Sequence, residues 1–166
     1  AVGESGLDLK HELAKVAVEM QVIIDQKDDF KAIAESALRH RRSAFYIGRG
    51  LDAAVAVEAA LKLKEISYVQ TEGFAAGELK HGTISLIEEG TPVFALLTQA
   101  KTAGLVRGEI AQVAARGANA VVIASKALDK PGDAYVLPDV NELLMPLLAV
   151  IPAQLIAYYA TLDRGL

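Results

Sequence analysis

The sequence predicts an α/β fold in which a parallel β-sheet is flanked by helices on both faces. Short runs of uninterrupted apolar residues alternate along the chain with longer segments of helical periodicity. Uninterrupted apolar strands are typical of parallel sheets covered on both faces, and the alternation is typical of βαβ units. Hydrophobic residues make up 52% of the 166 residues, which is enough to build one domain with a sizeable core.

Two helices are expected before the first strand. Apolar residues recur at helical spacing over residues 8–25, and residues 28–41 form a second, more polar helix with two aspartates near its start. We therefore divide the chain into a helical lead-in or connector, residues 1–42, and a sheet-containing domain, residues 43–166.

Strands and helices alternate through the rest of the chain. In order, we expect a strand at 44–48, a helix at 53–69, a strand at 92–97, a helix at 102–116, strands at 120–124 and 135–137, and a helix at 142–163. The last helix contains Pro146 and Pro152, so we expect it to be broken or kinked. Ligands of such sheets bind beyond the carboxyl ends of the strands.

The turn Gly48-Arg49-Gly50 follows the first expected strand, at that carboxyl edge. The free amide groups at the start of the next helix could hold a phosphate there. The full dinucleotide-binding fingerprint is absent, however, and a tight strand-to-helix turn needs the same glycines. The tight turn is the simpler interpretation, and the sequence assigns no role to Arg49.

The helix at 53–69 places a lysine within its apolar face. At about 100° per residue, one stripe of this helix collects Val55, Ala59, Lys62, Leu63 and Ile66. A buried ammonium group must be paired or neutralised, and Glu58 and Glu65 lie within pairing distance of Lys62 along the helix. Such a cluster indicates a site, although an ion pair that only locks the helix, with Lys62 reaching solvent, would leave the same pattern.

A second group of polar residues lies in a segment with little periodic pattern. Residues 72–83 read Glu-Gly-Phe-Ala-Ala-Gly-Glu-Leu-Lys-His-Gly-Thr, which places His81 between Lys80 and Gly82. Glu78 and His81 could suggest metal ligation, but no second histidine cluster accompanies them, so we expect no metal. A histidine titrates near neutral pH and can serve as a general acid or base.

These two segments carry a family resemblance. Residues 58–68, with Lys-x-Lys-Glu-Ile-Ser-Tyr, and residues 72–83 resemble the glutamine–fructose-6-phosphate aminotransferases, also called glucosamine-6-phosphate synthases. The match is to the second of the two sugar isomerase (SIS) lobes in their isomerase part. It covers most of residues 43–166 and continues through residues 48–50, 91–97, 114–119 and 150–159. The resemblance implies a SIS fold, which is flavodoxin-like or Rossmann-like.

The resemblance also implies a reaction and the residues that carry it. The family makes glucosamine 6-phosphate from fructose 6-phosphate and glutamine, in amino-sugar biosynthesis, and this part performs the ketose–aldose isomerisation. The family's catalytic glutamate and active-site lysine fall on Glu65 and Lys62, with Glu58 in a supporting role. Its ring-opening histidine falls on His81 and acts in the neighbouring subunit, which implies a homodimer. No metal or redox cofactor is implied.

The resemblance places several parts of the family outside this chain. These are a glutaminase domain, a first SIS lobe that holds most of the sugar phosphate, and a tail that bears the Schiff-base lysine. We interpret the chain as an excised lobe of a larger enzyme and expect it to be inactive alone. We expect no glutaminase activity in particular, since the chain has no cysteine to act as the family's thiol nucleophile.

Composition limits the classes of binding partner and the cellular compartment that we expect for this chain. The formal net charge of −4 and the lack of a long basic run argue against nucleic acid. We see neither a signal peptide nor a run of about 18 apolar residues, so we expect no membrane partner and a cytoplasmic location. Two alternatives stay open: a phosphosugar-sensing SIS module of a regulator, and a purely structural lobe. A regulator usually adds a helix-turn-helix, which residues 1–42 do not convincingly show, and it has no need for Lys62, Glu65 and His81 together.

Overall fold

The structure, a computed structural model, describes residues 8–166 and contains one parallel five-stranded sheet. Its strand order is β2-β1-β3-β4-β5. The strands are β1 (Ser43–Gly48), β2 (Gln70–Ala75), β3 (Pro92–Leu97), β4 (Asn119–Ser125) and β5 (Tyr135–Leu137). All neighbouring strands pair in parallel, which confirms the predicted α/β class.

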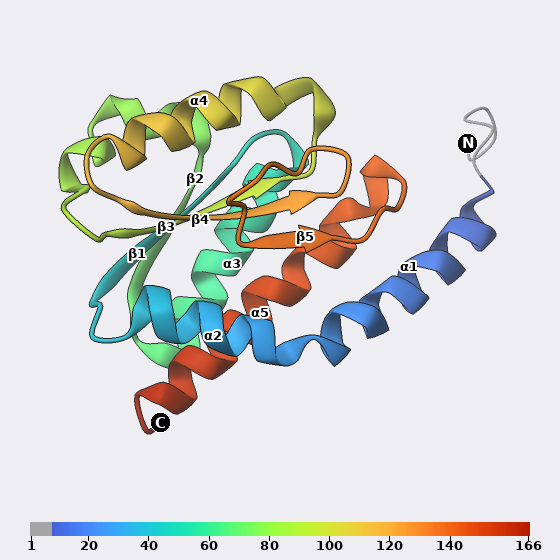
Figure 1. The fold of residues 1–166 in the computed structure, drawn as a ribbon, viewed down its shortest axis with the longest axis horizontal. Coiled ribbons are helices and arrows are strands. Elements are labelled where there is room, and N and C mark those ends of the chain that lie inside the picture. The colour runs from blue at the N-terminus through green and yellow to red at the C-terminus, as the bar shows by residue number, and fades with distance from the viewer. Residues whose placement is uncertain (1–7) are drawn as a thin grey trace.

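Helices cover both faces of this sheet, as predicted (Figure 1). They are α1 (Leu9–Asp25), α2 (Lys27–Leu38), α3 (Leu51–Ser67), α4 (Ala103–Ala114) and α5 (Met145–Asp163). Residues 8–166 also form four short 3₁₀ helices: η1 (Ala76–His81), η2 (Thr83–Leu86), η3 (Ala100–Thr102) and η4 (Glu142–Leu144). In Figure 1, α4 lies along one side of the sheet, and α2, α3 and α5 lie along the other.

Each face of the sheet has a hydrophobic core of its own, because consecutive strand residues point to opposite faces. On the face of α2, α3 and α5, Tyr46 of β1 stacks on Phe94 of β3 with 4.7 Å between ring centroids. On the face of α4, Phe45 and Ile47 of β1 pack in a second cluster with buried residues of α4 and η1. The sheet thus separates two hydrophobic cores, one beneath α2, α3 and α5 and one beneath α4.

The strand β2 was not predicted from the sequence. It is an edge strand, its residues alternate only weakly in burial, and it contains polar residues and Gly73. A side chain at Gly73 would collide with the backbone of Ala56 and Val57, because α3 crosses the strand there. The glycine that weakens the strand pattern therefore permits α3 to pack closely on β2.

The predicted helix at 142–163 consists of η4 and α5. Pro146 lies in the first turn of α5, where its missing N–H costs little, and the helix continues through Pro152. By length and composition, the stretch Glu142–Asp163 could cross a membrane, although we expected no apolar run of that length. A buried core helix passes the same test, and α5 packs against α2 and α3. The absence of a membrane partner stays a prediction.

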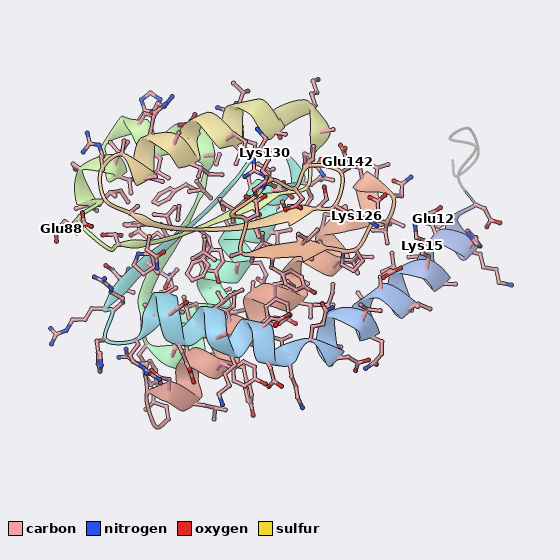
Figure 2. All side chains as sticks on the ribbon, viewed as in Figure 1. Glu12, Lys15, Glu88, Lys126, Lys130 and Glu142 are labelled. Carbon is pink, nitrogen blue, oxygen red and sulfur yellow. The ribbon has the colours of Figure 1, made fainter. Side chains whose placement is uncertain are left out.

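The two lead-in helices differ in how they meet the domain. Four residues of α2 are buried in the core shared with α3 and α5, whereas α1 buries only Val16 and Ile23. Figure 2 shows Glu12 and Lys15 on the outer part of α1, away from the sheet. The boundary between residues 1–42 and 43–166 stays a prediction. The helix α2 shares the hydrophobic core of the sheet-containing domain.

Candidate functional site

The first group of candidate residues lies in the last turns of α3. The Nζ atom of Lys62 is 2.9 Å from Oε2 of Glu65 and 3.6 Å from Oε1 of Glu58. The first of these contacts is also a hydrogen bond in which the ammonium group donates. A single cation is thus held between two carboxylates on one face of one helix, at the i−4 and i+3 spacing expected from the sequence.

Lys62 is not buried, so the expected position inside the core-facing stripe is wrong. Its side chain is 35% exposed, and that of Glu65 is 51% exposed. The buried face of α3 centres on Ala56, Ala59 and Leu63, because both the sheet and α5 pack against the helix. Lys62 lies at the border of this face, where its stem is covered and its charged end meets solvent.

The two carboxylates keep Lys62 in its protonated form. The hydrogen bond that Lys62 donates to Glu65, with the nearby charges of Glu58 and Glu65, raises the pKa of Lys62 above its usual value. The lysine therefore stays protonated throughout the neutral range. It cannot act there as a base, but it can stabilise negative charge on a bound molecule, and Glu65 is open to accept a proton from one.

His81, the third candidate residue, lies at the end of η1. Ala76 and Leu79 of η1 are buried in the cluster beneath α4, and His81 is exposed. Gly82 follows with φ of +130°, a conformation that favours glycine. Within residues 8–166, no hydrogen bond or ion pair holds the imidazole, so its direction depends on the backbone that carries it.

The structure does not bring His81 together with Lys62 and Glu65. The helix α3 covers one face of the sheet, and η1 packs with α4 on the other. The strand β2 runs between them, and its six residues span roughly 20 Å. Glu65 therefore lies toward the amino edge of the sheet and His81 at the carboxyl edge, and one copy of this chain cannot place both on one small substrate.

The Gly48-Arg49-Gly50 turn is explained by packing. A side chain at Gly48 would collide with the backbone of Asp52, and Gly50 has φ of +61°. The buried carboxylate of Asp52 accepts hydrogen bonds from the backbone N–H and the hydroxyl of Thr98, which joins α3 to the end of β3. Burial raises the pKa of Asp52, and these hydrogen bonds oppose the shift. These contacts account for both glycines.

The carboxyl edge of the sheet holds two hollows. One lies beside α4, encloses about 360 Å³ and is lined by Leu97, Arg107 and Lys130 among others. The other is a small cavity. Its volume is about 70 Å³, and Thr98, Ser125 and Glu142 contribute to its lining. Glu142, labelled in Figure 2, helps to close it by accepting a hydrogen bond from the backbone N–H of Ala100 at 3.1 Å. Small-molecule sites usually enclose about 300–1,000 Å³, so this cavity is too small for a hexose phosphate.

Among residues 8–166, no three histidine, cysteine, aspartate or glutamate side chains gather closely enough to hold a metal ion. The candidate residues are one ammonium, one or two carboxylates and one imidazole, which are the groups of proton-transfer chemistry. That the reaction needs no cofactor stays a prediction.

Comparison with known proteins assigns the fold to a family. The family model described as "SIS domain" matches residues 37–164 of this chain. The chain belongs to the SIS domain family. The match begins within α2 and ends at the last turn of α5, so this SIS domain includes every strand of the sheet.

The domain is also similar to named enzymes over nearly its whole length. It is 57% identical over 162 residues to the glutamine–fructose-6-phosphate aminotransferase [isomerizing] of Lactiplantibacillus plantarum. It is 59% identical over 160 residues to the enzyme of that name from Bacillus subtilis. These matches cover 98% and 96% of the chain but only 27% of either relative, so the chain spans about a quarter of their length.

A solved structure supports the same relationship. The C-terminal domain of glucosamine-fructose-6-phosphate aminotransferase from Francisella tularensis superposes on this SIS domain with a TM-score of 0.87 at 27% identity. The match covers 93% of this chain and 45% of that one. The resemblance inferred from the two motifs is therefore confirmed over almost the entire chain.

Two contacts of α4 were not anticipated from the sequence. Glu109 on α4 is buried and pairs with Lys80, whose Nζ lies 3.3 Å from its Oε1. Arg116, just beyond α4, donates from Nη1 to the carbonyl oxygen of Ile84 at 3.2 Å. The only signal in the sequence was the charged residue at 109, three and four residues from the apolar Val106 and Val113 on the same helix face.

Proposed function

We propose that this SIS domain is the second isomerase lobe of a glutamine–fructose-6-phosphate aminotransferase, acting in the formation of glucosamine 6-phosphate. The observation that carries the proposal is the identity of more than half of the residues with enzymes of that name over at least 96% of the chain. The exposed pair of Lys62 and Glu65 adds chemical support, because both groups are accessible to a substrate supplied from outside this domain.

The chemistry is a proton shift between C1 and C2 of an open-chain sugar. Glu65 is the carboxylate that takes the proton from one carbon and returns it to the other. Lys62, held in its charged form by Glu58 and Glu65, stabilises the negative charge that develops on the sugar oxygens. His81 moves a proton to and from the ring oxygen as the sugar ring opens.

His81 would act in the site of a second copy of the chain. The separation of His81 from Glu65 across the sheet supports this arrangement, because each residue is exposed on a different side of the domain. A two-fold symmetric dimer then contains two equivalent sites, each with Glu65 from one subunit and His81 from the other.

Other parts of the polypeptide would complete the site. A first SIS lobe would hold the phosphate, a proposal supported by the greater length of the relatives, of which this chain spans only 27%. A glutaminase domain would supply ammonia, and a C-terminal tail would supply the Schiff-base lysine. We place the enzyme in the cytoplasm.

The test is Glu65→Gln in the full-length polypeptide. Glutamine keeps the shape of the side chain but cannot take the proton, so sugar isomerisation should fall by about 10²-fold or more while glutamine hydrolysis is retained. Glu35→Gln on α2, which removes a carboxylate 3.9 Å from Arg39, is the matched control and should leave both activities unchanged. Isomerisation at the original rate in Glu65→Gln would contradict the proposal, and a wild-type protein that binds the sugar phosphate without converting it would favour a regulatory module.

A further inference from the structure

The segment that carries His81 is fastened to α4 at two points. We call residues 76–86, which comprise η1 and η2, the His81 segment. Near its middle, Lys80 pairs with the buried Glu109, and near its end the carbonyl of Ile84 accepts the hydrogen bond from Arg116. Glu109 lies within α4 and Arg116 lies in the turn that directly follows it, so both contacts come from α4 and its C-terminal end.

Glu109 has a buried carboxylate with one cationic partner among the described residues. Its side chain is 7% exposed, whereas that of Lys80 is 46% exposed. A buried carboxylate is tolerated when it is paired, so Glu109 constrains Lys80 more strongly than an exposed carboxylate would. Lys80 precedes His81 directly, and this ion pair therefore fixes the backbone immediately before the histidine.

The backbone after His81 is held by local contacts, since the Gly82 carbonyl accepts hydrogen bonds from the hydroxyl and the backbone N–H of Ser85 at 2.7 and 3.0 Å. Gly82 at φ of +130° has no other heavy atoms near the place of a side chain, and 3₁₀ helices such as η1 have poorer hydrogen-bond geometry than α-helices. No described side chain holds the imidazole. Lys80, through its ion pair with Glu109, is the residue next to His81 whose side chain joins this segment to α4, in addition to the buried Leu79.

We propose that Glu109 is a positioning residue for His81, acting through Lys80 to hold the imidazole in the direction needed by the neighbouring subunit's site. This inference rests on the proposed function, because it assumes that His81 opens the sugar ring. Arg116 supports the far end of the same segment. Glu109 itself does not touch the substrate in this proposal.

The experiment uses two substrates that differ in their need for ring opening. Fructose 6-phosphate exists mainly as a ring, whereas 5-deoxyfructose 6-phosphate lacks the hydroxyl that closes the furanose and stays open. In the full-length enzyme, Glu109→Met should lower kcat with fructose 6-phosphate by about 5- to 50-fold at unchanged KM, as expected for a displaced catalytic group. The rate with the open-chain analogue should change by less than about two-fold, since positioning of His81 does not affect that substrate.

Further variants separate the ion pair from general damage. Glu109→Gln keeps an acceptor for Lys80 and should recover part of the lost rate. Lys80→Met should reproduce the loss, and the double variant Lys80→Met with Glu109→Met should lose no more than either single one, because both remove one interaction. Asp163→Asn, which removes a carboxylate 2.9 Å from Arg39 on the other face, is the control and should behave like the wild type with both substrates.

Hydrogen exchange provides a second measurement, in case Glu109→Met folds poorly. In Lys80→Met, which changes the exposed partner of the ion pair, backbone amides of residues 76–86 should exchange hydrogen about tenfold faster while those of α3 stay unchanged. Unchanged exchange, no loss of rate in Glu109→Met, or an equal loss with both substrates would overturn the inference alone, provided that His81→Ala loses activity selectively with fructose 6-phosphate. If His81→Ala spares that substrate or affects both equally, the proposed role of His81 and this inference both fail.

Discussion

The helix α3 and the His81 segment hold their candidate residues in opposite ways. Lys62 and Glu65 lie on a long α-helix that packs against both the sheet and α5, and they are fixed by contacts with each other. His81 lies at the end of a short 3₁₀ helix, and the contacts that fix it belong to its neighbours in sequence and to α4.

This difference shows which part of the site one chain can arrange alone. The carboxylate and the ammonium group on α3 are already paired, so their geometry is complete within the domain. The imidazole is presented outward from the other side of the sheet without a partner among residues 8–166. Under the proposed function, the domain would supply two half-sites, one with Lys62 and Glu65 and one with His81.

The largest expected effect is the recovery of isomerisation activity in mixed dimers, which tests whether the two regions serve different subunits. We expect full-length His81→Ala and Glu65→Gln homodimers to be inactive in isomerisation. In the heterodimer, one site collects both defects and the other collects neither, so two-fold symmetry predicts up to about half of the wild-type activity.

The measurement is isomerisation by heterodimers that are co-expressed with two different tags and purified through both. Recovery should disappear when one parent carries both substitutions and the other carries His81→Ala, because every site then has a defect. A heterodimer as inactive as its parents would mean that His81 does not serve the partner's site.

A second prediction concerns β2, which joins the two regions. Gly73→Ala would place a Cβ against the Ala56 carbonyl of α3, and we expect it to lower the free energy of unfolding by about 1–3 kcal/mol through overpacking. Gly108→Ala on α4 is the matched control, because nothing lies near the position of its Cβ. There the same substitution should stabilise the chain by up to about 1 kcal/mol. Denaturant unfolding of the 166-residue chain measures both, and equal effects would contradict the close packing of α3 on β2.

The smallest expected effect is a change in the pKa of Lys62. Glu65→Gln removes the largest cause of its raised pKa, so the value should move down toward the ordinary one, and Glu58→Gln should lower it less. Because folding raises this pKa, the associated stabilisation is present below the unfolded lysine value of about 10.4 and is lost as pH rises through the folded value. An NMR titration of the Lys62 side chain measures the shifts, and a larger decrease in Glu58→Gln would reverse our ranking of the two carboxylates.

The sequence was informative where local pattern and structure agree. The strands at 92–97 and 135–137 were predicted with their observed bounds, since both are apolar and bounded by turn residues. The pairing of Lys62 with Glu58 and Glu65 followed from helical spacing alone. The motifs around these residues and His81 also indicate the family.

Tertiary packing decided the features that the sequence did not reveal. The burial of Lys62 was mispredicted because periodicity defines a stripe but not which neighbours cover it, and α5 shifts the buried face of α3. The strand β2 has too weak an alternation to be recognised. The contact of Glu109 with Lys80 joins residues that are 29 positions apart, and no local pattern specifies such a partner.

The place of β2 at the edge of the sheet has a consequence for solubility. An edge strand presents unpaired backbone groups to which another chain can add a strand, and such edges promote aggregation. β2 carries the charged Glu72 and passes at once into η1. Both features disfavour an added strand and so protect this edge of the sheet.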